Sequence, residues 1–115
     1  MTLKQLQQLE EHGKRVFDVL DKVAKEFQEK TNLKVEVKKD LNLYGSARPC
    51  FWITLAEKEL FYFRNAITNP RQPSPVFMKI DPEYEKDLLE LMEKHKEKLE
   101  FAHGVKVNYH TEKEV

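Results

Sequence analysis

The chain has 115 residues, a length typical of a single domain whose core is large enough to fold without metals or disulfides. Its 20 basic and 20 acidic side chains cancel, so no overall charge draws the protein to nucleic acid or to an anionic membrane surface. A lone cysteine excludes an internal disulfide, and no apolar run approaches the ~20 residues that span a bilayer. We therefore expect a soluble cytoplasmic protein with one domain over residues 1–110 and a frayed tail over 111–115.

The first predicted element is a long amphipathic helix from Leu3 to about Lys30. The same intervals of three and four residues that make its stripe also occur in coiled coils, so the helix could pack on its own sheet or self-associate. Packing on the sheet is favoured, because a glycine leaves a gap in a coiled-coil seam. The residues of the stripe are Leu6, Leu9, Gly13, Val16, Leu20, Val23 and Phe27.

A strand is predicted next, over 33–38, where apolar and charged residues alternate without a fault. Residues 39–48 contain Asn42, Gly45 and Ser46 and predict a loop.

The stretch from Pro49 to Arg64 holds the only Trp and the only Cys, and we expect most of the core to be laid around it. Two runs rich in aromatic and β-branched residues flank a short charged break, which predicts a hairpin. A helix beginning at Thr54 competes with it, because a capping-box spacing is followed by apolar residues at helical intervals. The hairpin is favoured because aromatic rings lose rotamer freedom in a helix, although the break lacks the Gly or Asn of tight turns.

Three elements complete the chain after a proline-rich loop at 68–75. A short strand is predicted over 76–80. A second helix begins at Asp81-Pro82-Glu83, an N-cap residue followed by proline and an acid, and ends before Gly104. A last strand is predicted over 105–109. The buried stripe of the second helix comprises Tyr84, Leu88, Leu91, Met92, His95 and Leu99.

This order of elements, α-β-β-β-β-α-β, predicts an α+β fold. Two long helices would pack on one face of a mainly antiparallel sheet of four or five strands and form two layers. Strict alternation then assigns six basic residues, one acid and three aromatic rings to the face turned away from the helices. They are Lys34, Glu36, Lys38, Trp52, Thr54, Tyr62, Arg64, Phe77, Lys79, Lys106, Asn108 and His110.

A mixture of rings and cations is typical of sheets that stack bases and hold phosphates, and clustered exposed rings generally mark contacts. We expect a partner-binding surface made by Trp52, Tyr62, Arg64, Phe77 and Lys79, with Arg71 on the proline loop. The alternative is that the rings belong to a second small core or a dimer contact and the lysines are ordinary solvated strand residues. The strands contain no ribonucleoprotein-type aromatic motif, which weakens the RNA interpretation.

The sequence offers no catalytic, metal or cofactor signature. Histidines and the cysteine lack the tight local spacing of zinc sites, and three glycines form no phosphate loop. Cys50 lies in an apolar run and is expected to be a small buried hydrophobe, whereas His95 on the helix stripe is expected to be a hydrogen-bonded core histidine. Ser46 and Ser74 have no neighbouring base in sequence.

One fragment, Glu36-Val37-Lys38, resembles the acid-x-lysine step of the PD-(D/E)xK nucleases, and the predicted order of elements is close to the core order of that fold. The resemblance would imply a metal-dependent nuclease. In that family the step lies on the third core strand, after an aspartate on the second, whereas here it lies on the first. Residues 52–54 and 62–64 on the later strands cannot bind a divalent cation, so the resemblance implies at most a nuclease-like fold without an intact metal site.

The hypothesis favoured by the sequence is a small non-enzymatic binding or regulatory protein, of the kind common among viral and mobile-element accessory proteins. It would contact a protein or nucleic-acid partner through the aromatic and basic sheet face and the proline loop, with no cofactor and no membrane contact. One alternative is a structural homo-oligomer, such as a homodimer, joined through the first helix. The other is the nuclease-like fold.

Overall fold

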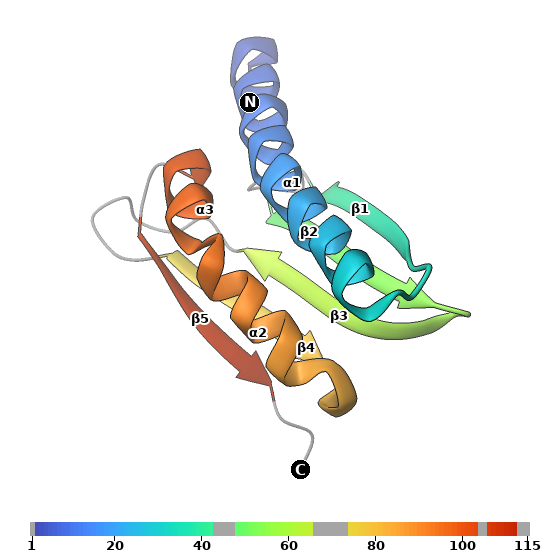
Figure 1. Cartoon of the computed structure of the whole chain (residues 1–115). Coiled ribbons are helices and arrows are strands. Elements are labelled where there is room, and N and C mark those ends of the chain that lie inside the picture. Colours follow the sequence, from blue (N-terminus) through green and yellow to red (C-terminus); the bar gives the residue numbers. More distant parts are fainter. Residues whose placement is uncertain (1, 43–47, 66–73, 104–105, 113–115) are drawn as a thin grey trace.

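The computed structural model describes residues 2–42, 48–65, 74–103 and 106–112, in which one mixed sheet carries all the helices on one face (Figure 1). This is the predicted two-layer α+β architecture. We call the face under the helices the helix face and the opposite one the outer face. The elements are α1 (Leu3–Thr31), β1 (Glu36–Asn42), β2 (Arg48–Leu55), β3 (Lys58–Asn65), β4 (Ser74–Ile80), η1 (Pro82–Tyr84), α2 (Glu85–Lys94), α3 (Lys96–His103) and β5 (Val107–Glu112).

The five strands lie side by side in sequence order, β1-β2-β3-β4-β5. The first three pairs are antiparallel and the last pair, β4 with β5, is parallel. A parallel pair needs a crossover connection, and η1, α2 and α3 supply it between these two strands. β1 and β5 are therefore the two edges of the sheet.

Helix α1 packs on the sheet of its own chain through the second half of the predicted stripe, and the side chains of Leu6 and Leu9 lie outside the described part. Val16, Leu20, Val23 and Phe27 are fully buried in the core, so this half of the stripe is not available as a coiled-coil seam. Gly13 is buried beneath the Leu41 side chain of β1, where a Cβ atom would collide with the leucine methyl groups. The glycine thus serves close contact between α1 and the edge strand.

The first strand begins and ends later than predicted. β1 runs from Glu36 to Asn42, whereas residues 33–35 connect it to α1 and 39–42 belong to the strand. The connection is held by hydrogen bonds to the end of the helix: Val35 N–H donates to Gln28 Oε1 (3.3 Å). Lys39, which breaks the alternation, is tolerated on the helix face because its ammonium group lies 2.9 Å from Asp21 on α1.

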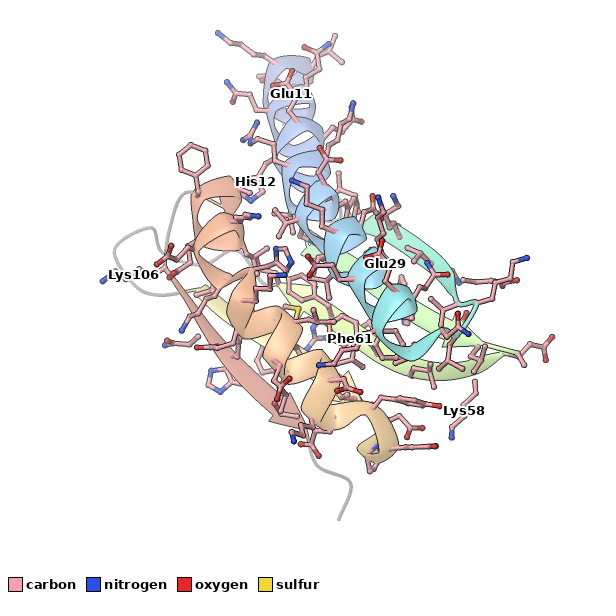
Figure 2. All side chains as sticks on the ribbon, in the orientation of Figure 1. Glu11, His12, Glu29, Lys58, Phe61 and Lys106 are labelled. Atoms are coloured by element: carbon pink, nitrogen blue, oxygen red, sulfur yellow. The ribbon has the colours of Figure 1, made fainter. Side chains whose placement is uncertain are left out.

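The hairpin prediction is confirmed, and the alternative helix from Thr54 is wrong. β2 and β3 are joined by a two-residue turn in which Ala56 and Glu57 both have positive φ, 49° and 67°. A β-bulge lies beside the turn, since the register shifts between Ile53 and Thr54, and it lets the consecutive residues Leu60 and Phe61 both enter the core. Figure 2 shows Phe61 between the helix layer and the sheet.

The second helix starts where predicted but is not continuous. Asp81 caps the 3₁₀ turn η1 by accepting a hydrogen bond from Glu83 N–H (3.0 Å), and α2 follows. His95 then leaves the helical conformation, with φ −97° and ψ 6°, and separates α2 from α3. Its N–H still donates to Leu91 C=O (3.1 Å), and its C=O accepts from Leu99 N–H (2.9 Å), so the two helices stay almost in line.

Three further boundaries differ from the predictions or lie outside the described residues. β4 begins at Ser74, inside the predicted proline loop, and the rest of that loop from 68 to 73 is outside them. β5 extends to Glu112, two residues into the predicted tail. Gly104 and Val105, predicted as a helix cap and a strand start, are also outside the described residues.

Candidate binding face

The outer face carries two rows of side chains that run across the strands. The register gives the first row as Lys38, Trp52, Tyr62 and Lys79, on β1 to β4. It gives the second row as Asp40, Cys50, Arg64, Phe77 and His110, on β1 to β5. Both rows exist because each strand alternates its side chains, so every second residue shares this face.

The first row is a pair of rings in tilted contact between two lysines. The Trp52 and Tyr62 ring centroids are 5.3 Å apart at 37°, and the Lys38 ammonium group lies 5.3 Å from the Trp52 ring. Both rings are half-buried, whereas Lys38 and Lys79 are exposed. The rings therefore hold one another in place while part of each remains accessible to solvent.

The second row repeats this arrangement with a different cation. The Arg64 guanidinium group lies 5.1 Å from the Phe77 ring, and Phe77 stacks on His110 with centroids 5.7 Å apart at 29°. Cation–π and stacking contacts of this kind each contribute about 0.5–1 kcal/mol near a surface. Arg64 and Phe77 are half-buried and His110 is exposed.

Cys50 lies in the second row but is buried, as expected of a small hydrophobe. The Tyr62 hydroxyl donates a hydrogen bond to its sulfur across 3.7 Å. Burial, with this contact as a second cause, raises the pKa of the Tyr62 phenol to about 12. Tyr62 is thus a neutral hydrogen-bonding ring at physiological pH.

The charge balance of this face is more even than alternation predicts. The register adds two acids, Asp40 beside Cys50 and Glu59 beside Thr54, which the predicted strand boundaries had placed in loops. Lys34 precedes β1, and Lys106 lies at the β5 edge beside α3 (Figure 2). Among the outer-face strand residues whose side chains the structure describes, the cations Lys38, Arg64 and Lys79 are matched by the acids Glu36, Asp40 and Glu59.

Five of the six predicted contact residues share this face: Trp52, Tyr62, Arg64, Phe77 and Lys79. Arg71 lies outside the described residues. Lys38 and His110 complete the rows and were predicted on the face, though not among the contact residues. Asp40 was missed because the alternation stops at Lys39, and only the partner strand reveals its place.

A second polar cluster joins the helices and looks at first like an acid–base pair. The Glu26 carboxylate on α1 accepts hydrogen bonds from His95 Nε2 (2.7 Å) and from Lys94 Nζ (3.0 Å). Since a carboxylate only accepts hydrogen bonds, His95 Nε2 carries a proton, and this contact is the main reason the pKa of Glu26 is lowered. His95 is only 3% exposed, so no substrate reaches it, and the predicted core histidine is confirmed.

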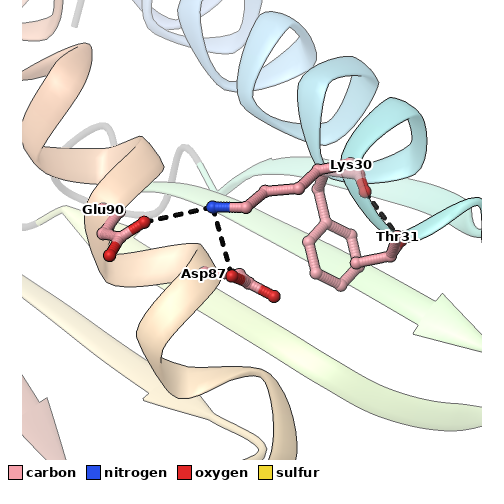
Figure 3. A network of polar contacts seen from close by, with 5 residues as sticks. Lys30, Thr31, Asp87 and Glu90 are labelled. Carbon is pink, nitrogen blue, oxygen red and sulfur yellow. Dashed lines mark hydrogen bonds and ion pairs between the residues drawn. The ribbon is translucent and has the colours of Figure 1, made fainter.

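A neighbouring cluster has the same structural role. The Lys30 ammonium group of α1 lies 3.2 Å from Asp87 and 3.1 Å from Glu90 of α2 (Figure 3). These ion pairs raise the pKa of Lys30. Both clusters fasten α1 to the helices that follow β4.

The residues of the nuclease-like fragment do not assemble an acidic centre. Glu36 and Lys38 lie on the edge strand β1, and their partners on β2 are Thr54 and Trp52, which supply no carboxylate for a divalent cation. In the described part of the chain no three His, Cys, Asp or Glu side chains are grouped so as to hold a metal ion. None of the helices in that part is long and apolar enough to cross a membrane.

Comparison of the chain with protein-family models, with characterised proteins and with solved structures finds no match. The functional argument therefore starts from the outer face itself.

Proposed function

We propose that this chain is a non-enzymatic binding or regulatory protein that contacts another protein through its outer face. The observation that carries the proposal is the pair of ring-and-cation rows across neighbouring strands. Trp, Tyr and Arg are the residues that most often dominate the energy of protein interfaces. Here they are gathered on the side of the sheet that carries none of the described helices.

The geometry of the rows favours tight contact. The Trp52 and Tyr62 rings already contact one another, and Arg64 already lies over Phe77, so little rotamer freedom remains to be lost on binding. Rigid aromatic anchors of this type supply contact area at low entropic cost. Lys38 and Lys79 flank the Trp52–Tyr62 pair, and charges at the rim of an interface contribute to its specificity.

The same face is less suited to nucleic acid. Binding to a phosphate backbone draws its affinity from several lysine or arginine contacts and the counterions they release. The described outer face has as many acids as lysines and arginines, and the whole chain is neutral. We therefore favour a protein partner, and the salt dependence of binding distinguishes it from DNA or RNA.

The test compares the wild type with Trp52→Ala and Arg64→Ala as baits in parallel capture experiments. Lys25→Ala, an exposed position on α1 on the other side of the molecule, is the matched control. The expected partner is retained by the wild type and the control and lost with both outer-face variants, all four chains giving the same circular dichroism spectrum. Retention by Trp52→Ala would refute the role of the face.

The captured partner is then purified and titrated directly. Truncating a central anchor such as Trp52 costs about 2 kcal/mol or more, roughly a 30-fold loss of affinity. With a protein partner, affinity changes little between about 50 and 200 mM salt, whereas a nucleic-acid complex weakens ~10³-fold or more when it makes many phosphate contacts. If the chain binds a single-stranded nucleic acid of about 20 nucleotides and the affinity falls steeply with salt, the partner is nucleic acid and not protein.

A further inference from the structure

Strand β1 is an edge strand of the described sheet. It pairs with β2 alone among the described strands, so the N–H and C=O groups along its other side are not used by the sheet. Val37, in the middle of this edge, is 37% exposed although its side chain faces the helix layer. A strand edge is a template for pairing with another strand, and natural proteins often protect it with charged side chains, four of which lie on β1.

The charges on β1 are arranged so that the strand complements itself. When two copies pair antiparallel around Lys39, Lys38 of each copy lies opposite Asp40 of the other. Val37 lies opposite Leu41 in the same register. Each contact occurs twice because of the two-fold symmetry, which gives two opposite-charge pairs on the outer face and two apolar pairs on the helix face.

Neighbouring registers lack this match. Pairing around Lys38 would bring Glu36 against Asp40 and Val37 against Lys39. Pairing around Asp40 would set that aspartate against itself and Lys39 against Leu41. A shift by half a step would place side chains of the helix face opposite those of the outer face, with the helices of the two copies on different sides of the joined sheet.

The one like-charged pair in the favoured register is Lys39 against Lys39. Each of these lysines is already paired within its own chain, since its ammonium group lies 2.9 Å from Asp21 of α1. Helix α1 lies over β1 and β2, so two such helices would stand about two strand spacings apart, roughly 10 Å. That distance is within the range of ordinary helix packing, about 8–10 Å.

We infer that the β1 edge is a homodimer interface in which a second copy of the chain adds its own β1 antiparallel, in register around Lys39. The two sheets then form one continuous sheet with all helices on one side. The outer faces of both copies become neighbours and present their Trp52 rows side by side. The interface does not use the buried half of the α1 stripe and so differs from assembly through that helix.

The test uses charge complementation between two single variants. Lys38→Glu places a glutamate against Asp40 in both pairs, and Asp40→Lys places a lysine against Lys38 in both pairs. Each variant alone should weaken the dimer roughly 10-fold, because two attractive cross-strand pairs become repulsive. When the two variants are mixed, the heterodimer pairs the new glutamate with the new lysine and keeps one native Lys38–Asp40 pair. Every pair is again opposite in charge, so the heterodimer should form at wild-type strength.

Sedimentation velocity measures the mass of the wild type and of each variant at protein concentrations from about 1 to 500 µM. This range covers a dimer with a dissociation constant on the order of micromolar. Lys22→Glu, the same charge change at an exposed α1 position, is the control and should remain dimeric. If a single variant fails to fold, the double variant Lys38→Glu/Asp40→Lys provides the test instead. It should dimerise with itself, because both cross-strand pairs are again opposite in charge. A monomeric wild type throughout, or variants whose mixing restores nothing, would overturn the inference.

Discussion

Replacing the hairpin turn Ala56-Glu57 by Asn-Gly should stabilise the protein. Both residues have positive φ, 49° and 67°, which is the type I′ geometry that best matches the twist of two paired strands. An ordinary L-residue pays about 1–2 kcal/mol for the left-handed conformation, while Asn and Gly adopt it readily. Glycine also loses more entropy on folding, so we expect a net gain of about 1–2 kcal/mol for the double replacement.

Urea unfolding followed by Trp52 fluorescence and by circular dichroism measures this gain, and heating should show a rise in Tm of about 4–8 °C per kcal/mol. Glu59→Gly is the matched control, because Glu59 lies in β3 two residues away and its φ is not positive. That variant should lose about 0.5–1 kcal/mol. The reasoning fails if Asn-Gly leaves the midpoint unchanged or lowers it while the control behaves as expected.

Three further changes test the packing of α1. Leu20→Glu should unfold the chain rather than release a folded monomer, since Leu20 is fully buried; a folded monomer by mass and circular dichroism would contradict this. Gly13→Ala should stabilise the folded chain by about 1 kcal/mol in a Leu41→Ala background and by less in the wild type, where the Leu41 side chain occupies the space of the new methyl group. Equal effects in urea unfolding would exclude the contact between Gly13 and Leu41. Glu26→Gln should lower the free energy of unfolding at pH 7, because the His95 contact lowers the pKa of Glu26 in the folded state. The difference in stability between variant and wild type should fade as pH drops below the ordinary glutamate range, since the stabilisation is lost as Glu26 protonates. A difference that does not change with pH would argue against the His95 contact.

The sequence was sufficient where local pattern and tertiary packing agree. The stripe of α1 follows from its periodicity, and the hairpin strands follow from their aromatic and β-branched composition. The members that enter the core include Val16, Leu20, Val23 and Phe27 of the stripe and Phe51, Phe61 and Phe63 of the hairpin. The bulge explains why Leu60-Phe61 lacks alternation: an extra residue in β3 directs two neighbours inward. The turn itself carried no Gly or Asn signal, and the strands impose its positive φ angles instead.

The remaining errors come from partners that are distant in sequence. Lys39 looks like the start of a loop, but pairing with β2 extends β1 to Asn42 and adds Asp40 to the outer face, while Asp21 on α1 pairs with the Lys39 ammonium group. The helix after β4 has no internal proline or glycine to break it. It is interrupted at His95, whose side chain bonds Glu26, a residue 69 positions earlier in the chain. Local patterns do not contain such pairings.

Acrylamide quenching of Trp52, the only tryptophan, tests most directly whether the outer face is open to a partner. The half-buried ring should be quenched at a rate between that of the urea-unfolded chain and that of a fully buried indole. Tyr62→Ala should raise the rate by removing the ring in contact with it. A native Trp52 that acrylamide does not quench, in both the wild type and the Tyr62 variant, would mean that this surface is closed and would contradict the proposed binding face.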